Sequence, residues 1–164
     1  MRLVYLSTFW TILLDFIVWL VIHLGVVHLM LHLSDKRFNL GNWLFREKSW
    51  EKGGRVYEEV FKIKKWKERL PDGSRIAKKR GFPKKQLQEK NLPYLDLFLR
   101  ETCRAELTHW IIILFAPFFF LWNKPGVGFF MIVYALIENL PLIMAQRYNR
   151  LRLIRVLSKV NNKD

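Results

Sequence analysis

The heptapeptide RAELTHW, residues 104–110, places Arg104, Glu106 and His109 directly before an apolar run. Glu106 and His109 are three residues apart, so their side chains share one face if the segment is helical. A carboxylate that holds one nitrogen of an imidazole leaves the other nitrogen available as a general base. The spacing therefore indicates proton abstraction, with His109 as the base and Glu106 as the group that orients it.

A second polar group follows the last apolar run, where QRYNR at residues 146–150 contains Arg147 and Asn149. Asn139 lies deeper inside that run, beside Glu138. Polar and ionisable groups within an apolar span are costly and are therefore candidates for function. We expect this group to meet Glu106 and His109 in one pocket at the membrane boundary. The alternative for the arginines is simple anchoring at the cytoplasmic surface, and the alternative for Asn139 is capping a helix break at Pro141.

Three apolar segments must position these side chains. They cover residues 3–33, 107–122 and 127–146, and the short link NKPG between the last two indicates a tight turn. Because about 20 residues suffice to cross the hydrocarbon layer, we predict an all-α integral membrane protein. It has about three transmembrane helices, with amphipathic interfacial helices on the cytoplasmic side. The whole chain, residues 1–164, is expected to form a single membrane domain.

The charges predict how the chain is oriented. Lys and Arg number 28 against 14 Asp and Glu, and they concentrate in residues 34–106 and in the tail 147–164. Cationic flanks remain in the cytoplasm, so we expect a multi-pass protein of the cell membrane with its N-terminus outside and both basic segments inside. The alternative for the first segment is a cleaved signal peptide, although no small-residue cleavage site follows it. Basic charge beside apolar spans favours anionic membrane lipids over nucleic acid as partners.

The central basic segment has its own pattern. Aromatic and aliphatic residues from Trp43 to Trp66 alternate with charges, which indicates amphipathic helices in the headgroup layer, interrupted at Gly53-Gly54. The sequence LPDG at residues 70–73 predicts a turn, and the basic stretch 74–90 predicts a surface loop near lipid phosphates. Beside Trp66, Lys64 and Lys67 suit a phosphorylated carrier that arrives from the cytosol.

No metal or other cofactor is expected. The pair His28 and His32 has helical spacing for a metal site but no neighbouring carboxylate, and the single Cys103 excludes an internal disulfide and a cysteine-rich metal site.

Several blocks in order resemble one family. RAELTHW, the later QRYNR, and EKGGRVYEEVFKIKKWKERLPDG in the middle are similar to the glycosyl-4,4'-diaponeurosporenoate acyltransferases of staphyloxanthin biosynthesis, from about Phe38 to the C-terminal tail. Two departures are visible, Glu138 in place of a small residue and Leu151 in place of proline. The positions that match the family are Glu51, Lys52, Gly53, Lys64, Trp66, Lys67, Leu70, Asp72, Gly73, Arg104, Glu106, His109, Asn139, Pro141 and residues 146–150.

The resemblance implies a transferase that esterifies the sugar of a glycosylated carotenoid acid, at its 6-hydroxyl, with a long fatty acyl chain. The acyl donor is expected to be acyl-CoA or an acyl carrier protein. Such a transfer needs a base for the alcohol proton and positive charge or donors at the developing oxyanion. His109 suits the first role; Arg147 or Arg104 suits the neutralisation of an oxyanion or donor phosphate, and Asn149 suits donation to the carbonyl oxygen.

Three alternatives remain open at this stage. Another glycolipid would fit the same acceptor chemistry. A di-iron lipid oxidase also uses Glu-x-x-His pairs, although only one such pair is present. A non-catalytic scaffold that recruits enzymes to anionic lipid would need only the basic amphipathic segment. The sequence does not fix the oligomeric state.

Overall fold

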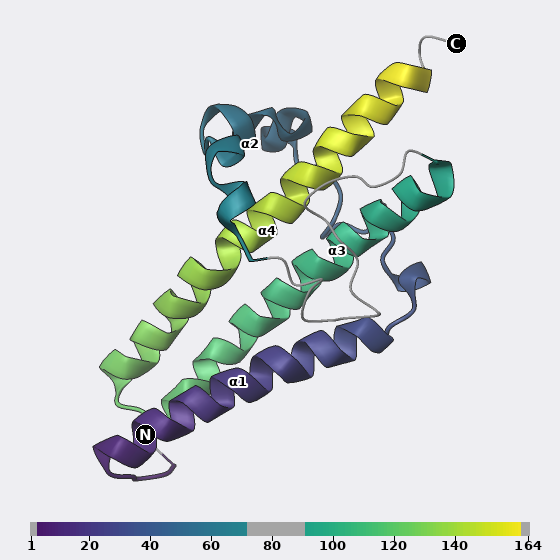
Figure 1. The fold of residues 1–164 in the computed structure, drawn as a ribbon. Coiled ribbons are helices and arrows are strands. Elements are labelled where there is room, and N and C mark those ends of the chain that lie inside the picture. The colour runs from purple at the N-terminus through teal and green to yellow at the C-terminus, as the bar shows by residue number, and fades with distance from the viewer. Residues whose placement is uncertain (1–2, 72–90, 162–164) are drawn as a thin grey trace. The chain divides into compact units, whose positions relative to one another are not determined.

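The computed structural model describes residues 3–71 and 91–161, and these residues form helices and turns without a strand. The α-helices are α1 (Thr8–His32), α2 (Arg55–Glu59), α3 (Leu92–Phe115) and α4 (Pro125–Asn161) (Figure 1). Short 3-10 helices join them: η1 (Asp35–Arg37), η2 (Ser49–Gly54), η3 (Ile63–Lys65), η4 (Lys67–Arg69) and η7 (Ala116–Leu121). The prediction of an all-α fold is confirmed.

Three helical segments are long and apolar enough to cross a membrane: Thr8–His32, Leu92–Leu121 and Pro125–Ser158. The first has a mean hydropathy of 2.3 and exposes large apolar side chains such as Phe9, Ile12 and Phe16. Such side chains are stable on a protein surface when lipid, rather than water, surrounds them. The chain is therefore a membrane protein with three candidate spans, as predicted.

The second and third helices extend beyond the predicted apolar segments. α3 begins at Leu92, before the segment 107–122, and charges in its first turns pair along the helix, as Arg100 does with Asp96 at 2.8 Å. α4 continues through Pro141 and includes the basic tail to Asn161, so a helix break at Pro141 is wrong. Proline removes one backbone donor, and the helix on both sides of it remains continuous.

The chain divides into two compact units. The first unit comprises residues 1–32 and 107–140, and the second comprises residues 33–106 and 141–164.

In the first unit, side chains from η7 and α4 pack against α1. The Trp19 ring stacks on Phe119 with centroids 4.7 Å apart, and its Nε1 donates to Met131 Sδ at 3.3 Å. Asp15 is the only charged residue between Leu3 and Leu33, and it is buried. Its Oδ1 accepts from Trp122 Nε1 and Asn123 Nδ2, both at 2.7 Å. These two donors compensate the carboxylate for the water it loses.

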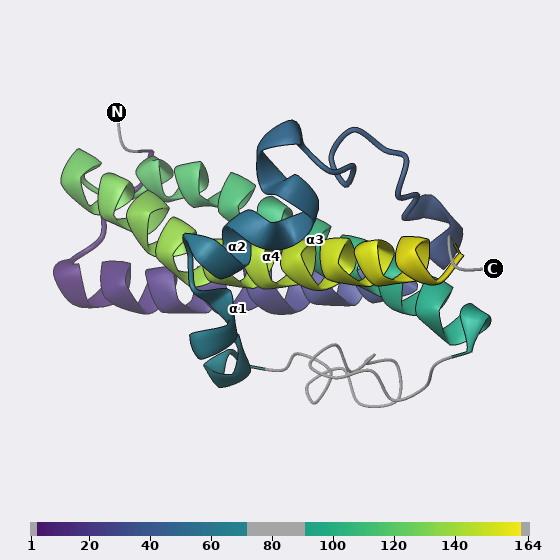
Figure 2. The same ribbon diagram turned by 90° about the horizontal axis from the view of Figure 1, so that it is seen from above.

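In the second unit, α2 lies against the C-terminal half of α4 (Figure 2). The core between them contains Tyr57, Ile63, Ala145, Tyr148 and Leu151. Gly54, with φ of +84°, permits this approach because a Cβ there would lie 3.3 Å from the Leu151 Cβ. The predicted interruption at Gly53-Gly54 is confirmed, since both glycines have left-handed backbone angles.

The central segment forms several short helices, η2, α2, η3 and η4. Tyr57 and Ile63 are buried, whereas Trp43, Trp50 and Val60 are exposed. The apolar residues therefore divide between a face that packs on α4 and a face that points outward. The predicted turn at 70–73 lies mostly outside the described residues, and the predicted basic loop at 74–90 lies wholly outside them.

Candidate functional site

The predicted base, His109, lies in the first unit. Its partner there is Asn139, whose Oδ1 is 2.9 Å from His109 Nδ1. Asn139 is almost fully buried, and its Nδ2 donates to the backbone carbonyl of Ala135 at 2.9 Å. The buried amide thus links α3 to α4 within the first unit.

This pair of hydrogen bonds determines the tautomer of His109. A backbone carbonyl only accepts, so the bond to Ala135 fixes which end of the Asn139 amide carries nitrogen. The oxygen end then faces His109, and Nδ1 of the imidazole must donate to it. In the neutral ring the lone pair therefore resides on Nε2, which is the atom that can accept a proton.

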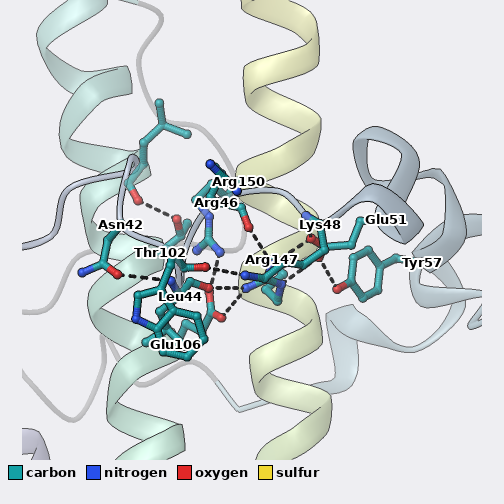
Figure 3. A network of polar contacts seen from close by, with 12 residues as sticks. Asn42, Leu44, Arg46, Lys48, Glu51, Tyr57, Thr102, Glu106, Arg147 and Arg150 are labelled. Carbon is teal, nitrogen blue, oxygen red and sulfur yellow. Dashed lines mark hydrogen bonds and ion pairs between the residues drawn. The ribbon is translucent and has the colours of Figure 1, made fainter.

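A network of buried charges lies in the second unit, with Arg147 at its centre (Figure 3). Its Nε and Nη2 donate to the two oxygens of Glu51, each at 2.7 Å. Its Nη1 donates to Glu106 Oε1 at 2.7 Å and to the Leu44 carbonyl at 2.8 Å. Nη2 also reaches the Arg46 carbonyl at 3.2 Å. All five N–H groups of a guanidinium thus have acceptors.

Glu51 is fully buried and holds the network to the central segment. Besides Arg147, it accepts from the Tyr57 hydroxyl at 2.6 Å and from the backbone N–H of Lys48 at 2.6 Å. Burial alone raises the pKa of this carboxyl, but the hydrogen bonds from Arg147, Tyr57 and Lys48 outweigh it and lower the pKa below its ordinary value. Burial and the bond to Glu51 raise the pKa of Tyr57. Glu51 is therefore a carboxylate and Tyr57 a neutral phenol at neutral pH.

Glu106 is also fully buried and joins two arginines. One oxygen accepts from Arg147, and the other accepts from Arg150 Nη2. This contact joins one residue from each of the two polar groups that were expected to meet, and the predicted pocket itself stays a prediction. The structure shows Asn139 at Nδ1 of His109, and the orienting role predicted for Glu106 stays a prediction.

The two arginines that contact Glu106 differ in their remaining donors. Arg147 has all five donors engaged, which leaves none for an oxyanion or a phosphate. Arg150 is fully buried, yet its Nε and Nη1 have no hydrogen-bond partner among the described residues. The Phe45 ring lies 5.7 Å from its guanidinium carbon, a contact that leaves these N–H groups unbonded. The sequence predicted Arg147 or Arg104 for anion binding, whereas the bonds of Arg147 make it the centre of a buried network.

Other predicted residues of the second unit have partners inside the protein. Arg104 is nearly buried and pairs with Glu101 and Asp35. Its charge is thus compensated within the protein, and its predicted role at an oxyanion or a donor phosphate stays a prediction.

The residues predicted to bind the acyl donor lie in η3, in η4 and between these two short helices. Lys64 pairs with Glu58, and Trp66 Nε1 donates to the Phe61 carbonyl at 2.9 Å. Lys67 Nζ donates to Asn149 Oδ1 at 3.2 Å and lies over the Tyr148 ring, 5.4 Å from its centre. Burial lowers the pKa of Lys67. The structure thus brings Lys67 and Asn149 together, while Lys64 and Trp66 each bond within residues 58–66.

Sequence reasoning missed the importance of Glu51 and Tyr57. Both belong to the block that carries the family resemblance, but nothing in the sequence indicates that Glu51 contacts a residue 96 positions away. The one available signal was a glutamate two residues before a Gly-Gly pair, since such a pair permits a sharp turn.

Comparison with known proteins decides the family. The family model described as glycosyl-4,4'-diaponeurosporenoate acyltransferase matches residues 41–159. The chain belongs to this family. The acyltransferase of that name from Staphylococcus aureus strain MRSA252 is 34% identical over 140 residues, which is 85% of this chain and 83% of that protein. The protein from strain Newman is 34% identical over 146 residues, or 88% and 87% of the two chains.

Membership of the glycosyl-4,4'-diaponeurosporenoate acyltransferase family makes the chain an acyl-transferring enzyme associated with carotenoid biosynthesis. The matched region contains Glu51, Glu106, His109, Asn139 and Arg147, so it includes both the buried network and the imidazole with its amide partner. No solved structure matches the chain.

Proposed function

We propose that the enzyme transfers a fatty acyl group to a sugar hydroxyl of a glycosylated carotenoid acid, with His109 as the general base. The observation that supports this role is the bond from His109 Nδ1 to the buried Asn139 amide, which leaves Nε2 as the basic atom. The family name supports the glycosylated carotenoid as the acceptor.

The proposed reaction is a direct transfer. Nε2 of His109 takes the proton of the sugar hydroxyl as its oxygen bonds to the acyl carbonyl carbon. The carbon–sulfur bond of the thioester then breaks, and the departing thiolate takes up the proton from the imidazolium. Asn139 keeps the ring in one orientation throughout, because its amide oxygen accepts from Nδ1 in both the neutral and the charged ring.

The donor in this proposal is acyl-CoA or an acyl carrier protein, both of which contain phosphate and a thioester. The exposed cations Lys52, Arg55, Lys62 and Lys64 on the short helices of the central segment support attraction of such a donor. Trp43 and Trp50 are exposed on the same segment, and tryptophan favours the membrane interface. The acceptor and the acyl tail would come from the bilayer, and anionic lipids would surround the basic segment.

The proposed topology has the N-terminus outside and the basic segments in the cytoplasm, on the charge asymmetry of the chain. It can be tested with Lys124→Cys and Lys65→Cys and a maleimide that does not cross membranes. The natural Cys103 is fully buried, which keeps background labelling low. Labelling of Lys124→Cys in intact cells, with Lys65→Cys labelled only after permeabilisation, is expected. The reverse pattern would contradict the orientation.

The decisive experiment for the reaction is mass spectrometry of pigments from cells that make the glycosylated carotenoid acid. The wild-type enzyme is expected to add a fatty acyl mass to this pigment. His109→Ala is expected to abolish the addition, and Asn139→Ala to reduce it, because the imidazole loses its fixed orientation. His28→Ala is a matched control, since His28 is an exposed histidine of α1 outside the proposed machinery.

The outcomes separate the parts of the proposal. Full activity of an equally abundant His109→Ala would exclude His109 as the base while leaving the acyl transfer itself in place. If the wild type adds no acyl mass to the pigment, the carotenoid acceptor is wrong, and an untargeted lipid comparison shows whether another glycolipid gains the acyl group.

A further inference from the structure

Besides His109, the first unit contains a pair of ionisable side chains that face each other. His23 on α1 and Glu138 on α4 face each other, with Nε2 and Oε2 3.7 Å apart. Neither is fully buried: the exposed fractions of the two side chains are 33% and 40%. Their exposed neighbours Leu20, Leu24 and Ile137 are apolar, so the pair interrupts a lipid-facing surface. An ionisable pair at such a place is costly and indicates a function.

The hydrogen bonding of His23 defines what the pair offers to a ligand. His23 Nδ1 lies 2.9 Å from the backbone carbonyl of Trp19. Because a carbonyl only accepts, Nδ1 is the donor, and the neutral ring presents the Nε2 lone pair toward Glu138. A distance of 3.7 Å exceeds that of a hydrogen bond. The gap between His23 and Glu138 is therefore rich in acceptors, and it is complementary to a molecule that brings hydroxyl donors.

Aromatic side chains flank this gap. The Trp19 ring lies 5.4 Å from the His23 ring and 5.6 Å from the Tyr134 ring. Tyr134 is partly exposed and lies one helical turn before Glu138 on α4, so the two side chains share a face of that helix. Hydroxyl-binding oxygens beside aromatic faces suit a sugar, which has hydroxyls at its edge and C–H groups on its faces.

The pair also lies level with the proposed base. Glu138 directly precedes Asn139, and one residue advances an α-helix by about 1.5 Å. Asn139 is bonded to His109, so Glu138, Asn139 and His109 occupy the same layer of the first unit. A ligand held by Glu138 therefore lies at the depth at which Nε2 of His109 acts.

We propose that Glu138 and His23 bind the sugar of the lipid acceptor and position its hydroxyls beside His109. Glu138 accepts from the sugar hydroxyls, and His23 provides a second acceptor. This site rests on the proposed function, because it binds the acceptor of that same reaction. Both residues act as positioning residues and exchange no proton with the reacting hydroxyl.

The test is the acceptor KM of the purified enzyme in lipid nanodiscs, at a saturating concentration of the acyl donor. Glu138→Ala is expected to raise the KM for the glycosylated acceptor about tenfold or more, since hydrogen bonds to a charged group are lost. The KM for the donor is expected to be unchanged. Glu138→Gln keeps one acceptor oxygen and the shape of the side chain, so it should fold as the wild type does and show a smaller increase. Glu59→Gln, an exposed glutamate of α2, is the matched control.

A binding measurement gives a second readout that does not depend on acyl transfer to the pigment. An alkyl glucoside should protect Tyr134→Cys, in a Cys103→Ser background, from maleimide labelling, whereas the alcohol of the same chain length should protect it less. Adding Glu138→Ala should remove the difference between the two probes. Equal protection by both probes with Glu138 present, or an unchanged acceptor KM in Glu138→Ala, would overturn the sugar site. Absence of acyl transfer by the wild type, with glucoside protection intact, would instead refute the proposed function.

Discussion

Replacing Arg147 with alanine tests whether the buried network of the second unit is structural. The substitution removes five hydrogen bonds and leaves Glu51 buried without its bidentate partner. Glu106 retains its contact with Arg150 but loses its contact with Arg147. Breaking a buried ion pair by removing one partner costs about 3–5 kcal/mol. That is a large part of the roughly 5–15 kcal/mol that stabilises a typical domain.

The measurement is thermal unfolding of the purified enzyme in detergent, followed by circular dichroism, together with its abundance in membranes. Arg147→Ala is expected to unfold at a much lower temperature than the wild type and to accumulate less. Arg147→Lys should be almost as unstable, because an ammonium has three donors and lacks the planar fork that binds Glu51. Arg152→Ala is the control, since Arg152 is an exposed arginine on the same helix.

A double substitution sharpens the test. Arg147→Met with Glu51→Gln removes both charges of the bidentate pair, so it should cost less than the two single substitutions added together. If Arg147→Ala retains the unfolding temperature of Arg152→Ala and loses only activity, the reasoning is refuted. Arg147 would then act on the substrate rather than on the fold.

Three further predictions concern the same unit. Tyr57→Phe removes the hydroxyl that donates to Glu51 at 2.6 Å, and it should reduce the free energy of unfolding by about 1.5–3 kcal/mol in the same assay. An unchanged stability would show that this bond contributes nothing. Gly54→Ala should destabilise the fold more than Gly53→Ala does. Each substitution costs about 1–2 kcal/mol because an alanine must adopt a left-handed conformation, but only at Gly54 does the new Cβ come within 3.3 Å of the Leu151 Cβ. Equal losses of stability would contradict this packing. The pKa of Glu51 is lower in the folded protein than its ordinary value of 4.5, so the ionised carboxylate stabilises the fold at pH values above 4.5. This contribution disappears as the pH falls through the lower pKa of the folded state. The stability difference between wild type and Glu51→Gln should therefore shrink below about pH 4.5, and a difference that grows on acidification would show the opposite shift.

The sequence predicted the all-α fold and the spans because long apolar segments have few other structures available in a membrane. It also predicted that the polar groups of Glu106 and Arg147 meet, since two helices joined by a short turn must run antiparallel, and the bond between these two residues agrees with that part of the prediction. It did not predict the turns of α3 before residue 107, because hydropathy does not detect helical turns whose charges pair with each other, as Asp96 and Arg100 do. It allowed a break at Pro141 where the helix continues.

The contacts of the central segment were beyond sequence reasoning for a different reason. Glu51 reaches Arg147 only because Lys52, Gly53 and Gly54 all adopt left-handed backbone angles, which turn the chain sharply between η2 and α2. A pair of glycines predicts that a turn occurs, but it does not determine which side chain the turn directs inward. The partner of His109 could not be predicted from the sequence either. Glu106 lies three residues away in sequence, whereas Asn139, which contacts the imidazole, lies on another helix.

The hydrogen-bond donors of Arg147 and Arg150 determine how a loss of activity at each arginine must be interpreted. Arg147 and Arg150 are both buried on α4, and both contact Glu106, so substitution of either is expected to reduce activity. For Arg147 every donor already has an acceptor inside the protein, and the loss of activity must follow from loss of structure. For Arg150 two nitrogens remain without a partner in the described part of the chain, so stability and activity need not fall together. Activity therefore has to be normalised to folded enzyme before either arginine is assigned to the reaction.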